Sequence, residues 1–71
     1  MTQEVTVVYE GFDVDKDRAI RALAEQYKGE DMGCGYFIDE DQRDMEFSFK
    51  DLKNSSAFRR DVNNKKLGRT L

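Results

Sequence analysis

Residues 44–50 read Asp-Met-Glu-Phe-Ser-Phe-Lys, so polar and large apolar side chains alternate along the whole stretch. A period of two is the pattern of a β-strand with one buried face, and it places Met45, Phe47 and Phe49 on that face. The apolar and aromatic stretch 34–38 precedes it, separated by the polar residues 39–43. A separation of this length predicts that the two stretches pair as a β-hairpin.

A further strand is predicted near the start of the sequence. Residues 4–10 are rich in β-branched side chains, and their alternation places Val5, Val7 and Tyr9 on one face. We therefore expect a half-buried strand over 4–10.

A helix is predicted between these strands, from about residue 15 to residue 28. Its apolar residues recur at helical spacing and are Ile20, Leu23, Ala24 and Tyr27. Asp13 or Asp15 can cap its start, Gly29 is expected to supply a left-handed residue at its end, and residues 30–33 are expected to form a loop.

A second helix is predicted after the hairpin. Asp51 or Asn54 can cap its first turn. Its inner stripe is expected to consist of Leu52, Ser55, Phe58 and Val62.

The predicted order of elements is β-α-β-β-α, an α+β fold. Both helix stripes are buried most directly on one face of a three-stranded antiparallel sheet, and a right-handed crossover gives the strand order 1-3-2. Over about residues 4–64 this topology resembles the ferredoxin-like split β-α-β fold. We expect one domain over residues 1–64 and a basic C-terminal tail over 65–71, which either frays or forms a short fourth strand.

Without a fourth strand, the outer edge of the strand that carries Val5, Val7 and Tyr9 would be free. It contains neither proline nor lysine, so another strand could add to it. The functional interpretation is pairing with a partner or with a second copy as a homodimer. The alternative is that residues 66–71 return and cover this edge.

Composition restricts the chemistry available to the protein. Its 71 residues include no histidine, no proline and one cysteine. The usual general base at neutral pH is therefore missing, as is the commonest zinc ligand. A lone cysteine cannot form an internal disulfide, and no apolar stretch approaches the length of a membrane span. We expect a cytoplasmic protein that is not an enzyme and that needs no cofactor or metal.

Charge is distributed unevenly along the sequence. Residues 1–51 carry 14 acidic and 6 basic side chains, whereas residues 52–71 carry 1 acidic and 6 basic. Such an acidic surface attracts basic proteins and repels phosphate backbones. The candidate partner-binding residues are Asp31, Tyr36, Phe37, Asp39, Glu40, Asp41, Asp44 and Glu46. The alternative is a solvated surface that only keeps a small protein in solution.

The basic C-terminal residues offer a second hypothesis, a nucleic-acid-associated regulator. The candidate phosphate contacts are Arg59, Arg60, Lys65, Lys66 and Arg69. These cations are too few to identify a nucleic-acid-binding protein, and direct binding is not the leading expectation. A third hypothesis is a dimer that senses a small molecule at its subunit boundary.

Two short motifs and the single cysteine could indicate specific chemistry. The spacing of Asp13, Asp15 and Asp17 is similar to the start of an EF-hand calcium loop. That loop requires a glycine and a glutamate at later positions, where this sequence has Arg18 and Ala24. The expected role of the aspartates is therefore helix capping. Residues 33–37 are similar to the aromatic RNP1 strand of RNA-recognition domains, yet the basic position is Met32. The two glycines there are expected to permit a bulge, and Cys34 is expected to be a buried or half-buried apolar residue.

The leading hypothesis is a small acidic protein-binding module that acts through its acidic hairpin. In size, charge and architecture it resembles the inhibitors that bacteriophages direct against host nucleic-acid machinery or immunity, including anti-CRISPR proteins and DNA mimics. That resemblance implies a partner with a basic surface.

Overall fold

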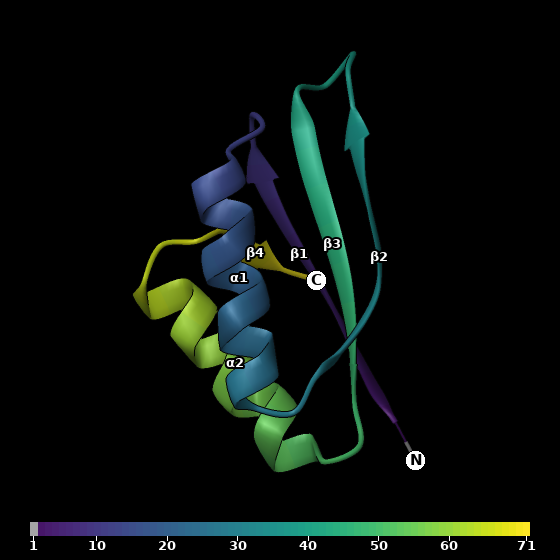
Figure 1. The fold of residues 1–71 in the computed structure, drawn as a ribbon, viewed down its shortest axis with the longest axis vertical. Coiled ribbons are helices and arrows are strands. Elements are labelled where there is room, and N and C mark those ends of the chain that lie inside the picture. Colours follow the sequence, from purple (N-terminus) through teal and green to yellow (C-terminus); the bar gives the residue numbers. More distant parts are fainter. Residues whose placement is uncertain (1) are drawn as a thin grey trace.

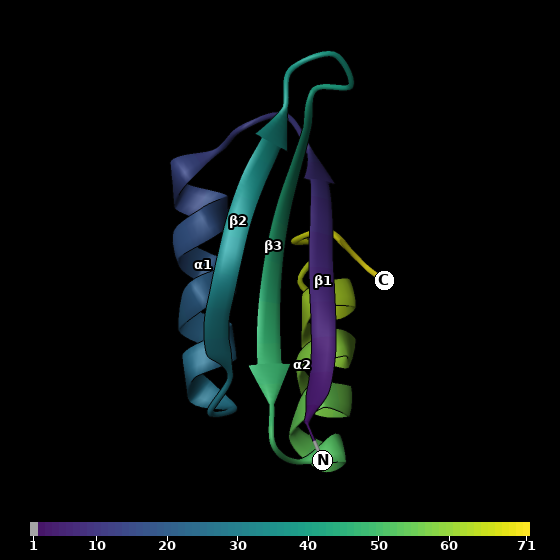
Figure 2. The ribbon, with the colours of Figure 1, turned by 90° about the vertical axis from the view of Figure 1, so that its right-hand side faces the viewer.

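The alternation over residues 42–49 produces the strand to which the rest of the sheet is attached. The computed structural model describes residues 2–71, which form β1 (Gln3–Glu10), α1 (Val14–Gln26), β2 (Glu30–Phe37), β3 (Gln42–Phe49), α2 (Leu52–Asn64) and β4 (Arg69–Thr70). The antiparallel sheet has the order β2-β3-β1-β4, with both helices packed on one of its faces (Figures 1 and 2). The predicted α+β fold and the order of its first three strands are confirmed, and β4 completes a ferredoxin-like topology.

The core lies between the sheet and the helices. The predicted inward residues of β1 and β3 are all buried, as are the α1 residues Ile20, Leu23 and Ala24. Phe58 of α2 packs between Phe47 and Phe49, with ring centroids 5.5 and 5.0 Å away. The prediction for Leu52 is wrong, because its side chain is 64% exposed at the first residue of α2, directly after the N-cap residue Asp51.

Asp13 caps the start of α1. Its Oδ1 accepts hydrogen bonds from the backbone N–H groups of Asp15 at 3.0 Å and Lys16 at 3.2 Å. The left-handed residue at the end of the helix is Lys28, with φ 61°, and not Gly29 as predicted. Gly29 is required for a different reason, since a Cβ there would lie 2.6 Å from the buried ring of Phe49.

β2 begins at Glu30, within the segment predicted to be a loop. Its register against β3 shifts between Asp31 and Gly33, and Gly33 has φ 127°. The extra residue, Met32, interrupts the alternation that marks a strand, which explains why the sequence resembles a loop there. The bulge expected from the glycines is present.

β4 covers part of the outer edge of β1. It pairs with Val7 and Val8, and the Leu71 N–H donates to the Thr6 carbonyl at 2.8 Å. Farther along the same edge, Arg59 Nη2 donates to the Glu4 carbonyl at 3.3 Å. The edge carrying Val5, Val7 and Tyr9 is therefore covered in part, by the return of the C-terminal residues that was the alternative prediction. A homodimer through this edge would have to displace β4.

Neither of the two helices found in residues 2–71 is long and apolar enough to cross a membrane.

Candidate functional site

The β2–β3 hairpin extends past the helices and past the end of β1 (Figures 1 and 2). We refer to residues 36–41 as the hairpin tip. Phe37 is 55% exposed and Ile38 is 80% exposed, and the next three residues, Asp39, Glu40 and Asp41, are exposed as well. Residues 36–40 line a shallow hollow. The tip thus displays apolar and anionic groups side by side.

Hydrogen bonds within and below the hairpin tip fix its conformation. The Glu40 N–H donates to the Phe37 carbonyl at 3.2 Å, and Asp41 adopts φ 50°, which closes the turn. The Tyr36 hydroxyl donates to the Asp41 carboxylate, and this hydrogen bond raises the pKa of Tyr36. The Gly11 N–H donates to the Asp41 carbonyl at 2.7 Å, which ties the tip to the loop after β1.

A buried ionic network lies directly beneath the tip. Arg43 of β3 and Asp17 of α1 are 6% and 3% exposed, and they are joined by hydrogen bonds from Arg43 Nη2 at 2.8 Å and Nε at 3.1 Å to Asp17 Oδ2. The Tyr9 hydroxyl also donates to Asp17. Arg43 Nη1 donates to the Gly35 carbonyl at 3.1 Å. One guanidinium thereby connects three elements.

The network holds its charges in the ionised form. Burial opposes ionisation of Asp17, but the hydrogen bonds from Arg43 and Tyr9 outweigh it and keep the pKa of this carboxyl below its ordinary value. The hydrogen bond to Asp17 raises the pKa of Arg43. Burial, followed by the hydrogen bond to Asp17, raises the pKa of Tyr9.

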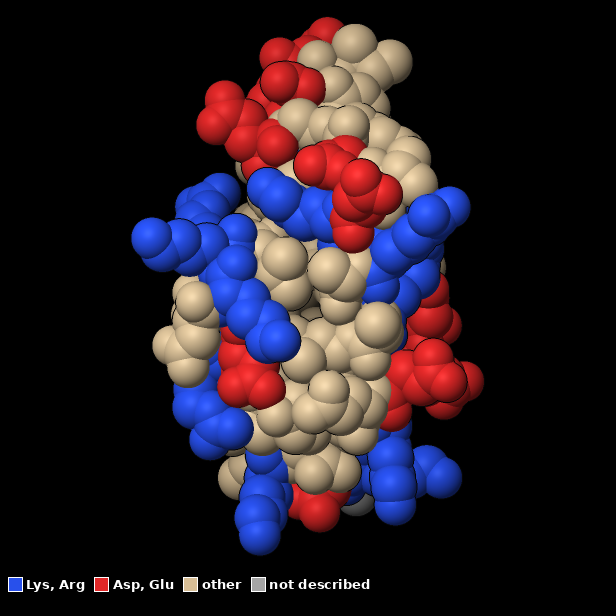
Figure 3. Space-filling model, turned by 60° about the vertical axis from the view of Figure 1, so that its left-hand side comes forward, with Lys and Arg blue, Asp and Glu red and all other residues tan. Residues whose placement is uncertain are grey.

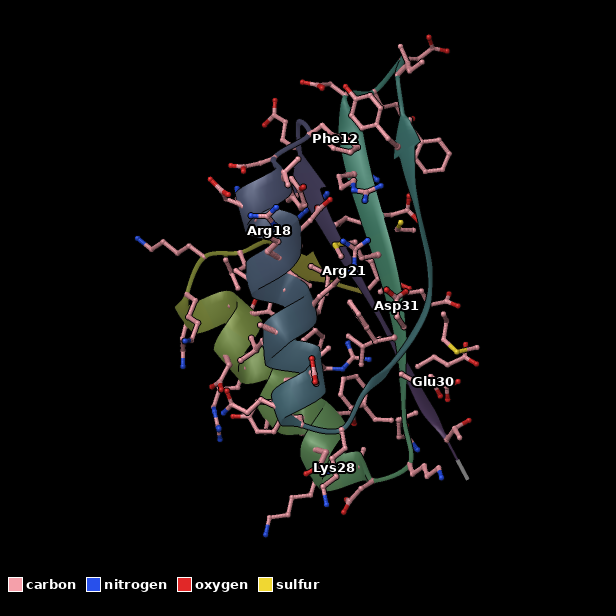
Figure 4. All side chains as sticks on the ribbon, viewed as in Figure 1. Phe12, Arg18, Arg21, Lys28, Glu30 and Asp31 are labelled. Atoms are coloured by element: carbon pink, nitrogen blue, oxygen red, sulfur yellow. The ribbon has the colours of Figure 1, made fainter. Side chains whose placement is uncertain are left out.

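Phe12 covers this network from the solvent side. Its ring lies 4.6 Å from the Arg43 guanidinium carbon and meets the Tyr36 ring edge to face at a centroid distance of 5.5 Å. Figure 4 shows Phe12 in the loop between β1 and α1, beside the upper part of the hairpin. Phe12 and Tyr36 thus join the rigid network to the exposed tip.

The second sheet face carries no helix, as Figure 2 shows. We refer to this surface as the open sheet face. The β1 and β3 residues that alternate with the core residues lie on it, and their register pairs are Glu4 with Ser48, Thr6 with Glu46, Val8 with Asp44, and Glu10 with Gln42. Arg69 is paired with Val8 and brings a cation to this predominantly acidic surface.

The structure divides the predicted partner-binding residues into three groups. Tyr36, Phe37 and the carboxylates of residues 39–41 come together at the hairpin tip. Asp44 and Glu46 lie on the open sheet face. Asp31 is elsewhere, because the bulge in β2 directs it to the helix side, where Arg21 Nε is 3.3 Å from its Oδ2 (Figure 4).

Charge separates the two layers of the molecule. The helices and their ends, residues 14–29 and 51–68, carry nine basic and five acidic side chains; the remainder of the sequence carries three basic and ten acidic. Figure 3, viewed from the helix side, shows acidic groups gathered around the hairpin end; below it, Lys and Arg are spread over the surface together with further acidic groups.

The basic C-terminal residues do not all lie on one face of the molecule. Arg59 donates to the carbonyls of Leu71 and Glu4, Arg60 Nε lies 3.4 Å from Asp61 Oδ1, and Arg69 lies on the open sheet face. Lys65 and Lys66 are exposed where α2 ends.

Cys34 is exposed, which contradicts its predicted burial. It lies on the edge strand β2, on the same face as its register partner Met45, and its Sγ is 3.6 Å from Arg21 Nη2 of α1. In the part of the chain that the structure describes, no three Cys, Asp or Glu side chains are arranged to hold a metal ion.

Sequence reasoning located the tip but missed the buried network. Both partners nevertheless lie on inward positions, because Arg43 precedes Met45, Phe47 and Phe49 at a spacing of two and Asp17 precedes Ile20 at a spacing of three. An arginine on the inward face of the strand and an aspartate on the inward face of the helix were the features of the sequence that could have indicated a buried ion pair.

Comparison of the chain with protein-family models, with curated proteins and with solved structures finds no significant match.

Proposed function

We propose that this protein is a binding module for another protein and that its hairpin tip docks onto a basic surface of that partner. The observation that carries the proposal is the exposure of Phe37 and Ile38 next to the carboxylates of residues 39–41. Protein interfaces commonly combine a small apolar anchor with a polar or charged rim. The tip offers both in consecutive residues.

The rigidity of the tip supports this proposal. The Tyr36–Asp41 hydrogen bond, the tie from Gly11 and the contact between Phe12 and Tyr36 hold the tip in one conformation before any partner arrives. A surface that is already ordered loses less conformational entropy when it binds. The exposed carboxylates also steer a cationic partner toward this end of the molecule.

An inhibitor of host nucleic-acid machinery or immunity, of the kind encoded by bacteriophages, is the role we propose for the module. Carboxylates at the tip and on the open sheet face present negative charge to a site that evolved to bind phosphates. A cytoplasmic location belongs to the same proposal, since the single thiol, Cys34, is exposed and a reducing compartment would preserve it.

The nucleic-acid-associated alternative receives less support. Arg59 and Arg60 are engaged with groups of their own chain, and Arg69 lies among acidic neighbours. Phosphate binding needs several cations directed toward one backbone, and of these cations Arg59 contacts carbonyls of its own chain while Arg69 lies on the sheet.

The test compares a tip variant with a charge-matched control. Asp39→Asn/Glu40→Gln/Asp41→Asn removes three carboxylates from the tip, and the control Asp15→Asn/Glu25→Lys changes the net charge by the same three units at exposed positions of α1. Each protein is immobilised and used to capture partners from a host lysate, with quantification by mass spectrometry. We expect the tip variant to lose the partner that wild type and control retain. Equal recovery by all three proteins would contradict the proposal.

A further inference from the structure

The two edges of the sheet differ greatly in length. β4 forms one edge with only two residues, whereas β2 forms the other with eight and is paired only with β3 within residues 2–71. In an antiparallel sheet, every second residue of an edge strand directs its N–H and C=O groups away from its neighbour. β2 therefore offers unpaired main-chain groups to an added strand.

Natural proteins protect such edges with lysine, proline or a bulge. β2 contains neither lysine nor proline, and its bulge between Asp31 and Gly33 affects only its first part. From Gly33 to Phe37 the strand is regular, each residue opposing one residue of β3. Within this segment the Gly35 carbonyl already accepts a hydrogen bond from Arg43 Nη1 at 3.1 Å, but no lysine, proline or further bulge blocks the edge.

The side chains beside this segment favour a cationic occupant. Glu30 and Asp31 lie at one end of β2, and Asp39 and Glu40 follow its other end. If two copies paired through β2 in antiparallel fashion, the acidic start of each strand would lie beside the acidic tip of the other. That like-charge opposition disfavours a second copy and favours a basic segment of a different protein.

Two glycines open a path from the edge to the carboxylates of β3. Gly33 is the register partner of Glu46, and Gly35 is the register partner of Asp44, all on the open sheet face. A Cβ on Gly33 would meet nothing within 4 Å, and a Cβ on Gly35 would lie 3.0 Å from Asp44 Oδ1. Asp44 therefore leans over a strand that has no side chain at this position.

Asp44 Oδ1 also lacks a hydrogen-bond partner among the described residues, although it is shielded from solvent. A buried acceptor without a donor carries a free-energy cost that a ligand can relieve. An added strand would lie about 5 Å outside β2 and about 10 Å from β3. Long basic side chains on that strand can lie across Gly33 and Gly35 and donate to Glu46 and Asp44.

We propose that the partner adds an extended segment to the free edge of β2, with Lys or Arg at alternating positions opposite Gly33 and Gly35. Main-chain hydrogen bonds fix the segment, and its cations pair with Asp44 and Glu46. This inference rests on the proposed function, because it takes the partner to be a protein with a basic surface. It identifies the strand that the partner contacts next to the hairpin tip.

The test uses defined peptides. The probe is Thr-Arg-Thr-Arg-Thr-Arg-Thr with blocked ends, and the matched control is its isomer Arg-Arg-Arg-Thr-Thr-Thr-Thr, which has the same charge and composition. A third peptide carries backbone N-methyl groups on alternate residues of the probe and cannot pair as a strand. Affinity is measured by calorimetry, and amide exchange along β2 by NMR.

We expect the alternating peptide to bind more tightly than its isomer and to slow exchange of alternate amides between Gly33 and Phe37. Asp44→Asn/Glu46→Gln should weaken its binding by about tenfold or more, because two charge-assisted hydrogen bonds are lost. The charge-matched variant Asp39→Asn/Glu40→Gln should reduce affinity less. N-methylation should abolish the protection of the β2 amides.

Three results would overturn the inference. These are equal binding of both isomers, binding of the N-methylated peptide as tight as that of its parent, and protection of β2 by self-association without any peptide. If peptide binding depends on Asp39 and Glu40 but not on Asp44 and Glu46, the edge is excluded while the hairpin tip remains the docking site. Lysate capture that is insensitive to the tip variant would instead refute the proposed function and leave these peptide readouts unchanged.

Discussion

Arg43 connects more parts of the molecule than any other single side chain described above. It donates to Asp17 on α1 and to the Gly35 carbonyl on β2, and it lies against Phe12 in the loop between β1 and α1. A buried ion pair of this kind adds little net stability compared with apolar residues, but removing one partner leaves an uncompensated charge. Its specific effect is to fix the position of the hairpin relative to the first helix.

We predict that Arg43→Met lowers the free energy of unfolding by about 3–5 kcal/mol, because it leaves Asp17 buried without its cation. The double variant Asp17→Leu/Arg43→Met should recover most of this loss. Urea denaturation followed by circular dichroism measures both. If the single and double variants were equally unstable, packing and not charge would explain the effect.

The same pair predicts a specific acid sensitivity. The pKa of Asp17 is lower in the folded protein than in the unfolded chain, where it returns to about 3.9. The unfolded chain therefore binds the proton more readily, so the contribution of Asp17 is present above that value and is lost as the pH falls through the lowered pKa. We expect wild type to lose more stability between pH 6 and pH 3 than Asp17→Leu/Arg43→Met does. Parallel curves for the two proteins would contradict this assignment.

At the scale of elements, β4 depends on a single glycine. A Cβ on Gly68 would lie 2.6 Å from the carbonyl oxygen of Val8, a backbone atom that cannot move aside without disturbing β1. We predict that Gly68→Ala detaches β4 and costs about 1–3 kcal/mol. Hydrogen exchange should accelerate at Thr6 to Val8 and not in β2, and concentration-dependent association should increase because a strand edge becomes free. Unchanged exchange at these amides would show that the chain tolerates the added methyl group.

The elements that could be predicted from the sequence are those with uninterrupted periodicity. Alternation located β1 and β3 to within two residues, and helical spacing located α1. The start of β2 was missed because Met32 is an extra residue that interrupts the alternation of the strand. Whether β4 forms could not be predicted, because a strand of two residues is too short to show an alternation. The hairpin tip was predicted from its run of carboxylates, whereas the pairing of Asp17 with Arg43 depends on how α1 packs against β3, a three-dimensional relation.

At the scale of the whole molecule, charge is sorted by layer and not by position in the sequence. The division expected near residue 51 is only part of the pattern, since α1 also contributes cations to the basic helix layer. The sheet and hairpin layer is acidic. A partner with a basic surface is therefore attracted to one side of the molecule and repelled from the other, so its orientation is selected before contact.

We predict that the rate of association with a basic partner, or with the alternating arginine peptide, falls steeply as salt increases. The range of exposed charges shrinks to about 8 Å at 0.15 M ionic strength. The tip variant Asp39→Asn/Glu40→Gln/Asp41→Asn should reduce both the rate and its salt dependence, while Arg18→Gln/Lys28→Gln on the helix layer should not reduce the rate. Stopped-flow measurements at several salt concentrations distinguish the two. An association rate independent of salt would exclude steering by charge.

The hairpin tip stands beyond the helices, and the buried side chains that hold the fold together lie below it. Under the proposed function, replacing residues 37–40 therefore changes the docking surface without unpacking the interior. On the same proposal, recognition and folding depend on separate parts of this chain, so a variant with a new tip keeps the same scaffold. The same separation makes the loop a practical place to graft new sequences.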